Sequence, residues 1–230
     1  MTIMPPIRGL SGVKQVLTEH LAEAAGDGEV IFTTSLSRED QVLTWAIVEA
    51  GLPIDIVTLD TGKLFPETLE LLDLTERMLD IRIGRVHPDP DLVAAFETTP
   101  GMQAIYEGVD ARKQCCHIRK VAPLKQACAG KKWWVTGLRQ GQSQHRASLS
   151  MVEPMPEWDL KKLHPLLEWS DEDLDNALPE LGIPVNPLHA QGYPSIGCSP
   201  CTRAVSPGEH PRSGRWWWEQ SSKECGLHRG

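Results

Sequence analysis

Residues 29–62 read EVIFTTSLSREDQVLTWAIVEAGLPIDIVTLDTG, and this stretch decides the fold. It begins with a short β-rich run at 29–33, continues as an apolar helical pattern at 40–50, and returns to a strand pattern at 54–59. Two strands separated by one helix predict a right-handed βαβ unit with parallel strands. The stretch therefore favours an α/β fold.

The same alternation extends in both directions from this stretch. Helices are predicted at 11–25, 66–78, 111–129 and 170–181, and strands at 81–86 and 132–136. Pro66 opens one helix, and Ser170 is a plausible N-cap for the last. We predict a mostly parallel sheet flanked by helices. We expect one domain over 1–230, with a core of about 1–185 and a flexible, catalytic tail of about 186–230 that is loop-rich and rich in Cys, Trp and Arg.

Charge and hydropathy narrow the possible partners. The formal net charge of the 230-residue chain is −8, so we expect no nucleic-acid partner and no attraction to an anionic membrane. No apolar run approaches the roughly 20 residues of a membrane span. The N-terminus lacks the continuous apolar region of a secretory signal. A cytoplasmic location is expected.

The cysteines carry the most information. There are six, at positions 115, 116, 128, 198, 201 and 225. In a reducing compartment such residues are more often metal ligands or redox nucleophiles than structural disulfides. The Cys198-x-x-Cys201 spacing is typical of metal ligands, and the Cys115-Cys116 doublet supplies two more thiolates. Zinc and a redox disulfide remain open, but the doublet favours an iron–sulfur cluster. Cys128 is predicted to be a buried apolar cysteine.

Cys225 stands apart from that set. It lies between Lys223 and His228, close to the C-terminus. Neighbouring basic groups lower a thiol pKa, and a thiolate is a good nucleophile. The alternative is a terminal thiol with no role.

Two further groups of residues suit an anionic ligand. Ser35, Ser37 and Asp40 form a polar turn at a helix N-terminus, which can bind phosphate or serve as an ordinary N-cap. Thr61 and Gly62 follow the next strand, at the edge where open α/β sheets bind ligands. Basic residues cluster around the cysteines, at positions 112, 113, 119, 120, 139, 146, 203, 212 and 215. The Trp216-Trp217-Trp218 run is expected to anchor the tail or to form a subunit contact.

Together these motifs resemble the sulfonucleotide reductase family, specifically its iron–sulfur branch, the adenylyl-sulfate reductases of assimilatory sulfate reduction. The resemblance covers about residue 30 to the end of the chain. It rests on the segments 59–62 (LDTG), 65–68 (FPET), 113–120 (KQCCHIRK), 198–203 (CSPCTR), 214–219 (GRWWWE) and 223–228 (KECGLH).

The resemblance implies an adenine nucleotide alpha hydrolase-like fold, in which the turn 35–40 resembles a modified pyrophosphate loop (PP-loop). The glycine pair of the ATP-cleaving version of that loop is missing here. The resemblance also implies a 4Fe–4S cluster bound by Cys115, Cys116, Cys198 and Cys201. It implies that the cations that bind the phosphosulfate are Lys120, Arg139, Arg146, Arg212 and Arg215.

The implied reaction is the reduction of adenosine 5'-phosphosulfate to sulfite and AMP. The Cys225 thiolate attacks the substrate sulfur, with His228 favouring the thiolate, and AMP leaves. A thioredoxin or glutaredoxin-like dithiol then resolves the S-sulfocysteine. A homo-oligomer is expected.

Three alternatives remain. A 3'-phosphoadenosine 5'-phosphosulfate reductase or a dual-specificity enzyme shares the fold, although the cluster-free branch lacks the four cluster cysteines. An iron–sulfur tRNA thiolation enzyme requires a glycine-containing pyrophosphate loop and a basic surface. A non-enzymatic zinc-binding module does not need Cys225.

Overall fold

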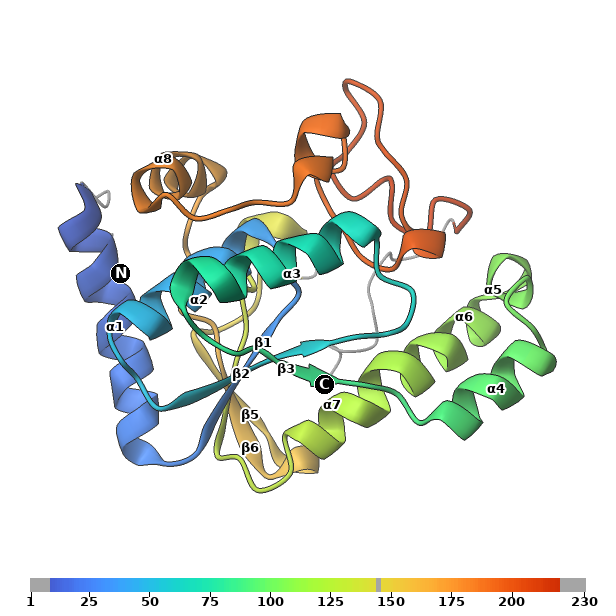
Figure 1. Ribbon diagram of the computed structural model, residues 1–230, viewed down its shortest axis with the longest axis horizontal. Coiled ribbons are helices and arrows are strands. Elements are labelled where there is room, and N and C mark those ends of the chain that lie inside the picture. The colour runs from blue at the N-terminus through green and yellow to red at the C-terminus, as the bar shows by residue number, and fades with distance from the viewer. Residues whose placement is uncertain (1–8, 144–145, 220–230) are drawn as a thin grey trace.

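The chain is built around one six-stranded sheet, in a computed structural model that describes residues 9–143 and 146–219 (Figure 1). The strand order is β3-β2-β1-β4-β6-β5. All neighbouring strands run parallel except β5, which is antiparallel to β6. The strands are β1 (Val30–Thr34), β2 (Ile54–Leu59), β3 (Gly84–Val86), β4 (Trp133–Val135), β5 (Val152–Met155) and β6 (Leu160–Leu163). The predicted fold class is confirmed.

Helices cover both faces of this sheet. Alternate residues of β1 point to opposite faces, as the period of a strand requires. Phe32 packs in a core with α1, α2 and α8, whereas Ile31 packs on the other face with residues from α7, including Leu124. The helices are α1 (Gly9–Asp27), α2 (Arg38–Glu49), α3 (Pro66–Leu79), α4 (Pro90–Thr98), α5 (Ala104–Glu107), α6 (Val109–Cys116), α7 (Ala122–Ala127) and α8 (Asp171–Leu181). In the part of the chain that the structure describes, no helix is both long and apolar enough to cross a membrane.

The helix predicted at 111–129 is divided into three segments. A π-helical turn, η1 (His117–Val121), separates α6 from α7. The Ala122 amide donates to the His117 carbonyl five residues back, and Pro123 then has no amide hydrogen to continue the ordinary pattern. Insertions of this type often occur at functional sites. This one directly follows the cysteine doublet.

Several elements differ from the prediction or were not predicted. The strand expected at 81–86 pairs only over Gly84–Val86. The sheet also continues past β4 into β6 and β5, which the sequence did not indicate. Proline is unusual inside sheets, but Pro154 is accepted because β5 is an edge strand. The cap at Ser170 is confirmed, since its side chain accepts a hydrogen bond from the Asp173 amide.

The segment after α8 is loop-rich, as expected. Within its described part, the regular turns are η5 (Pro187–Gln191) and η6 (Ser199–Cys201). It reaches back to other elements through backbone contacts. The Ser199 amide donates to the Lys63 carbonyl at 2.8 Å, and the Tyr106 hydroxyl donates to the Pro200 carbonyl at 2.9 Å. These contacts bring the C-terminal segment to the carboxyl end of β2 and to α5.

Candidate active site

The turn between β1 and α2 lies at the carboxyl edge of the sheet. Ser37 caps α2 by accepting a hydrogen bond from the Asp40 amide at 3.2 Å. The Ser35 amide and hydroxyl both donate to Asp40 Oδ2, at 2.6 and 2.7 Å. Burial raises the pKa of Asp40 from 3.8 to about 6, and the hydrogen bonds from Ser35 oppose that shift. The three predicted residues therefore form one hydrogen-bonded turn.

One residue of this turn, Leu36, has a backbone conformation that glycine usually adopts. Leu36 has a φ of 60°, in the left-handed region that other residues rarely occupy, and its side chain is buried. Residues held in such a conformation cluster at functional sites.

Gly137, just after β4, lies against the same turn. A Cβ atom at this position would come within 2.3 Å of Asp40 Oδ1, so only glycine allows the approach. The loop after β4 and the turn after β1 consequently form one edge.

The loop after β2 connects this edge to the cysteines. Thr61 is buried, and its hydroxyl lies 3.3 Å from the Cys198 sulfur. Its carbonyl accepts a hydrogen bond from Arg119 at 2.7 Å. Gly62, in contrast, is exposed. Thr61 thus forms part of the wall between the carboxyl edge of the sheet and the second half of the site.

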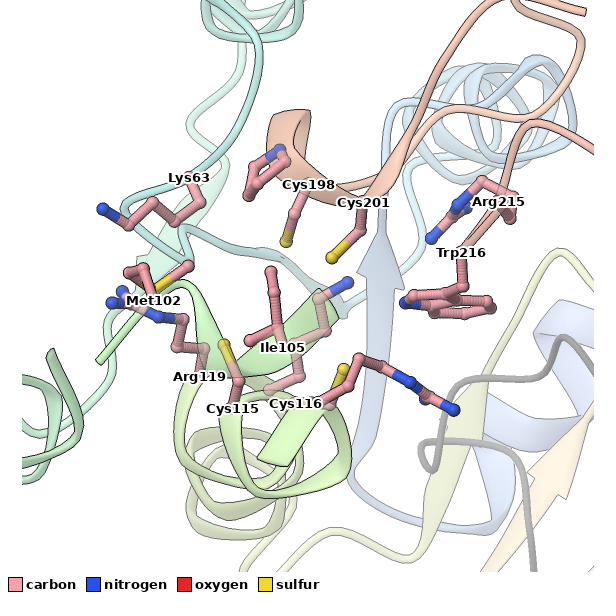
Figure 2. A pocket seen from close by; sticks show the side chains of 13 residues that line it. Lys63, Met102, Ile105, Cys115, Cys116, Arg119, Cys198, Cys201, Arg215 and Trp216 are labelled. Carbon is pink, nitrogen blue, oxygen red and sulfur yellow. The ribbon is translucent and has the colours of Figure 1, made fainter. Parts of the chain in front are cut away.

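That second half is a pocket lined by all four of the predicted cluster cysteines. Figure 2 shows Cys115 and Cys116, at the end of α6, facing Cys198 and Cys201 across it. All four side chains are buried. Burial raises the pKa of Cys115 above its usual value and that of Cys201 to about 12. Such thiols become good ligands when a metal stabilises the thiolate.

Cations surround these thiols. The basic residues that line the pocket are Lys63, Arg112, Arg119, Lys120 and Arg215. Sequence reasoning selected Lys120 and Arg215 as anion-binding residues, and the structure places both beside the cysteines. It noted Arg112 and Arg119 only as members of a basic cluster, and it missed Lys63. The signal for Lys63 was its position one residue after Gly62.

Carboxylates neutralise part of this charge. Glu97 of α4 accepts from Arg119 at 2.6 Å and lies 3.0 Å from Lys63. Glu219 accepts two hydrogen bonds from Arg112, at 2.7 and 2.9 Å. Lys120 and Arg215 belong to the same pocket, and the charges of both favour the thiolate form of Cys201.

The chemistry of the donor set bears on the group that the pocket can hold. Four buried thiols line it, and basic residues lie beside them. Iron–sulfur clusters are bound by four thiolates, and a structural zinc ion can use the same four ligands. The donor set therefore fits an iron–sulfur cluster, which the two cysteine pairs would hold.

The other predicted ligand residues are more dispersed. Arg139 is buried away from the cysteine pocket, in ion pairs with Glu39 at 2.9 Å and Asp171 at 2.5 Å. Arg146 is buried and donates to the Gln142 side chain. Arg212 is half-buried in the C-terminal segment. The predicted nucleophile Cys225 and its partner His228 lie outside the described residues.

Comparison with known proteins agrees with this arrangement. Residues 29–204 match the phosphoadenosine phosphosulfate reductase domain. An adenosine 5'-phosphosulfate reductase of Agrobacterium fabrum is 50% identical over 92% of this chain and 82% of its own length. Another protein of that name, from Allochromatium vinosum, is 51% identical over 87% of this chain and 78% of its own. The fold is similar to that of a phosphoadenylyl-sulfate reductase from Candida auris, with a TM-score of 0.68 and 22% identity, covering 89% of this chain and all of that one.

The fold and these relatives define an oxidoreductase that acts on a sulfur group. With most of its length matched, the chain belongs to the phosphoadenosine phosphosulfate reductase family.

Proposed function

We propose that this chain reduces adenosine 5'-phosphosulfate to sulfite and AMP, with electrons from a thioredoxin-like dithiol. One observation carries the proposal. Four buried cysteines line a pocket together with Lys120 and Arg215, and Thr61 joins that pocket to the carboxyl edge of the sheet. A nucleotide bound at the edge would present its phosphosulfate to these cations. The names of the relatives that are half identical to this chain support the same substrate.

The residues of the site divide into two roles. The turn with Ser35, Ser37 and Asp40 and the loop with Thr61 and Gly62 hold the nucleotide. The phosphosulfate is bound by basic residues, for which we propose Lys120, Arg146, Arg212 and Arg215. Arg139, which the resemblance also implies, is assigned to the fold instead, because Glu39 and Asp171 engage its guanidinium. Guanidinium and ammonium groups held in a buried site stabilise the charge that develops on the leaving phosphate.

The proposed chemistry is thiol exchange with a covalent intermediate. The Cys225 thiolate attacks the sulfur of the substrate, the S–O bond to the phosphate breaks, and AMP leaves. A thiolate of the donor then attacks the Cys225 sulfur, and sulfite departs with the electron pair of the S–S bond. The donor's second thiol releases Cys225 from the mixed disulfide. The donor loses two electrons in this exchange. His228 favours the thiolate form of Cys225.

We propose that Cys115, Cys116, Cys198 and Cys201 hold a 4Fe–4S cluster. The four buried thiols and their cationic surroundings support this assignment, because such clusters are bound by four thiolates. The cluster would supply structural and electrostatic stabilisation, since the dithiol already provides both electrons.

A cytoplasmic location suits these reduced thiols. We propose a homo-oligomer and a single domain, with a core of about 1–185 and a catalytic tail of about 186–230.

The test is sulfite release from adenosine 5'-phosphosulfate, with and without thioredoxin, by protein purified without oxygen. We expect release only with thioredoxin, and without it one SO3 group added to the peptide that contains Cys225. Cys225→Ser should abolish release, whereas Cys128→Ala, which changes a buried thiol outside the pocket, should not. Sulfite release by the Cys225→Ser variant would exclude the mechanism.

The metal content and the nucleotide preference are separate measurements. Cys198→Ser should remove most of the bound iron, and iron near zero in the unmutated protein would refute the cluster. The second candidate substrate is 3'-phosphoadenosine 5'-phosphosulfate, because the matching domain and the similar solved structure carry the name of that nucleotide. Equal or faster sulfite release from it would replace the first assignment.

A further inference from the structure

A buried ion pair joins the doublet helix α6 to the C-terminal segment. Arg112 Nε and Nη2 donate to the two carboxylate oxygens of Glu219, at 2.7 and 2.9 Å. The side chains are only 2% and 3% exposed. Two parallel hydrogen bonds between charged groups fix direction as well as distance. The pair spans 107 residues of sequence.

The residues around this pair are also held firmly. The Arg112 and Arg215 guanidinium carbons each lie 4.7 Å from the centroid of the Trp216 ring. Trp216 is 1% exposed and has a φ of 42°, a conformation that is unfavourable for a bulky residue and persists only where surrounding contacts impose it. The backbone from 216 to 219 is therefore fixed against α6.

The position of the pair relates the cysteine pocket to the tail. Arg112 lines the pocket and interacts with the thiol of Cys116. Glu219 lies six residues before Cys225. A backbone of six residues spans at most about 20 Å, so the position of Glu219 limits how far the chain can carry Cys225.

We propose that Arg112 and Glu219 are positioning residues, which fix the base of the catalytic tail to the doublet helix and thereby direct Cys225 toward the pocket. This inference rests on the proposed function, in which Cys225 is the nucleophile. Arg112 acts through Glu219 and Trp216 instead of binding the substrate, because the carboxylate already engages and neutralises its guanidinium.

Magnitudes separate positioning from simple tethering. Without the pair, the next backbone position held independently of it is Trp216, whose amide donates to the Cys201 carbonyl at 3.2 Å. The free tether then lengthens from six to nine residues. Tether length alone would lower the effective concentration of Cys225 only about twofold. Loss of direction costs more, because a misplacement of about 1 Å can slow a reaction on the order of 100-fold.

The test compares Glu219→Gln with Glu209→Gln. Glu209 forms a similar two-bond pair with Arg203, but that pair is partly exposed and joins two residues of the C-terminal segment only six positions apart. The rate of S-sulfocysteine formation at Cys225 is measured at saturating adenosine 5'-phosphosulfate without thioredoxin. AMP affinity and bound iron are measured on the same samples. For Glu219→Gln we expect a rate at least tenfold lower, with AMP affinity and iron within about twofold of the unmutated protein.

Each outcome is decisive. A rate lowered only about twofold would mean tethering without direction and would overturn the proposal. A parallel loss of AMP affinity would assign the pair to substrate binding and also overturn it. If the Glu219→Gln variant loses iron, the Glu219→Asp variant is tested in its place, since aspartate keeps the charge and only shortens the side chain. That variant should retain iron and slow adduct formation, and an unchanged rate would refute positioning. Absence of the adduct from the unmutated protein would instead refute the proposed function.

Discussion

Arg139 offers the clearest separation of a structural role from a binding role. The resemblance implies that it binds the phosphosulfate, but the structure places it in a buried network. Its Nε donates to Glu39 at 2.9 Å, its Nη1 to the Trp169 carbonyl at 2.9 Å, and its Nη2 to Asp171 at 2.5 Å. The loop after β4 is thereby joined to α2 and to the start of α8. We expect Arg139→Met to weaken the fold much more than ligand binding.

The size of the effect follows from the exposure of the two carboxylates. Removing one partner of a buried ion pair costs about 3–5 kcal/mol. Asp171 is 78% exposed, so its ion pair with Arg139 contributes only what a surface pair does, below about 1 kcal/mol of the free energy of unfolding. Glu39 is buried but keeps a hydrogen bond from the Gln142 side chain at 2.8 Å. The expected loss is therefore at the lower end, about 3 kcal/mol in the free energy of unfolding.

Urea unfolding followed by tryptophan fluorescence measures the stability, and calorimetry with AMP measures the affinity. Arg38→Met is the matched control, because Arg38 also joins α2 to α8 through Asp175, but its side chain is partly exposed and that of Asp175 is exposed. It should cost less than about 1 kcal/mol. We expect Arg139→Met to leave AMP affinity within about threefold, which is less than 1 kcal/mol. A stability loss below about 1 kcal/mol together with a tenfold weaker affinity would refute this reasoning and support the binding role.

Three shorter predictions concern the carboxyl edge and the pocket. The raised pKa of Asp40 means that the folded state binds a proton more tightly than the unfolded state between about pH 4 and 6. The free energy of unfolding should therefore fall as the pH rises through that window, by up to about 1.4 kcal/mol per pH unit. Asp40→Asn should flatten this slope in urea titrations at several pH values, and an unchanged slope would contradict the assignment. Leu36→Gly relieves about 1–2 kcal/mol of left-handed strain but removes a buried side chain worth about 3–5 kcal/mol. It should therefore destabilise the protein by about 1–4 kcal/mol, whereas a gain in stability would mean that strain dominates. Arg215→Ala should weaken AMP and substrate binding by about 1.5–3 kcal/mol in calorimetry, and unchanged affinity would remove Arg215 from the anion site.

The elements that the sequence predicted are those with long, regular patterns. The βαβ unit at 29–62 and the capped helix α8 lie within one or two residues of their expected bounds. Short elements were missed for a physical reason. Each strand of the β5–β6 pair has only four residues, and Pro154 argues against a strand unless the edge position is known. The break in the helix at 117–121 depends on a hydrogen-bond pattern that residue spacing does not reveal.

In the site, the sequence indicated which cysteines lie together, but it did not indicate which carboxylates pair with the basic residues. Cysteine spacing predicted one site for four thiols, and the structure places all four in one pocket, because a doublet and a Cys-x-x-Cys turn each fix two sulfur atoms locally. The counter-charges are different, since Glu97 and Glu219 belong to segments whose spacing relates neither of them to the pocket. Glu97 pairs with Lys63 and Arg119, and Glu219 is bound by Arg112.

These long-range pairs determine what the cations can do. Five basic residues line the pocket, and a count from sequence would assign all of them to an anionic substrate. The structure pairs Lys63, Arg112 and Arg119 with carboxylates, so much of the positive charge serves to join α4, α6 and the C-terminal segment around the thiols. Arg112 and Arg119 thereby connect the cysteine doublet to the C-terminal segment, to the loop after β2 and to α4. Tertiary contacts therefore assign some of the pocket's cations to building the site, and residue counts in the sequence could not have made that assignment.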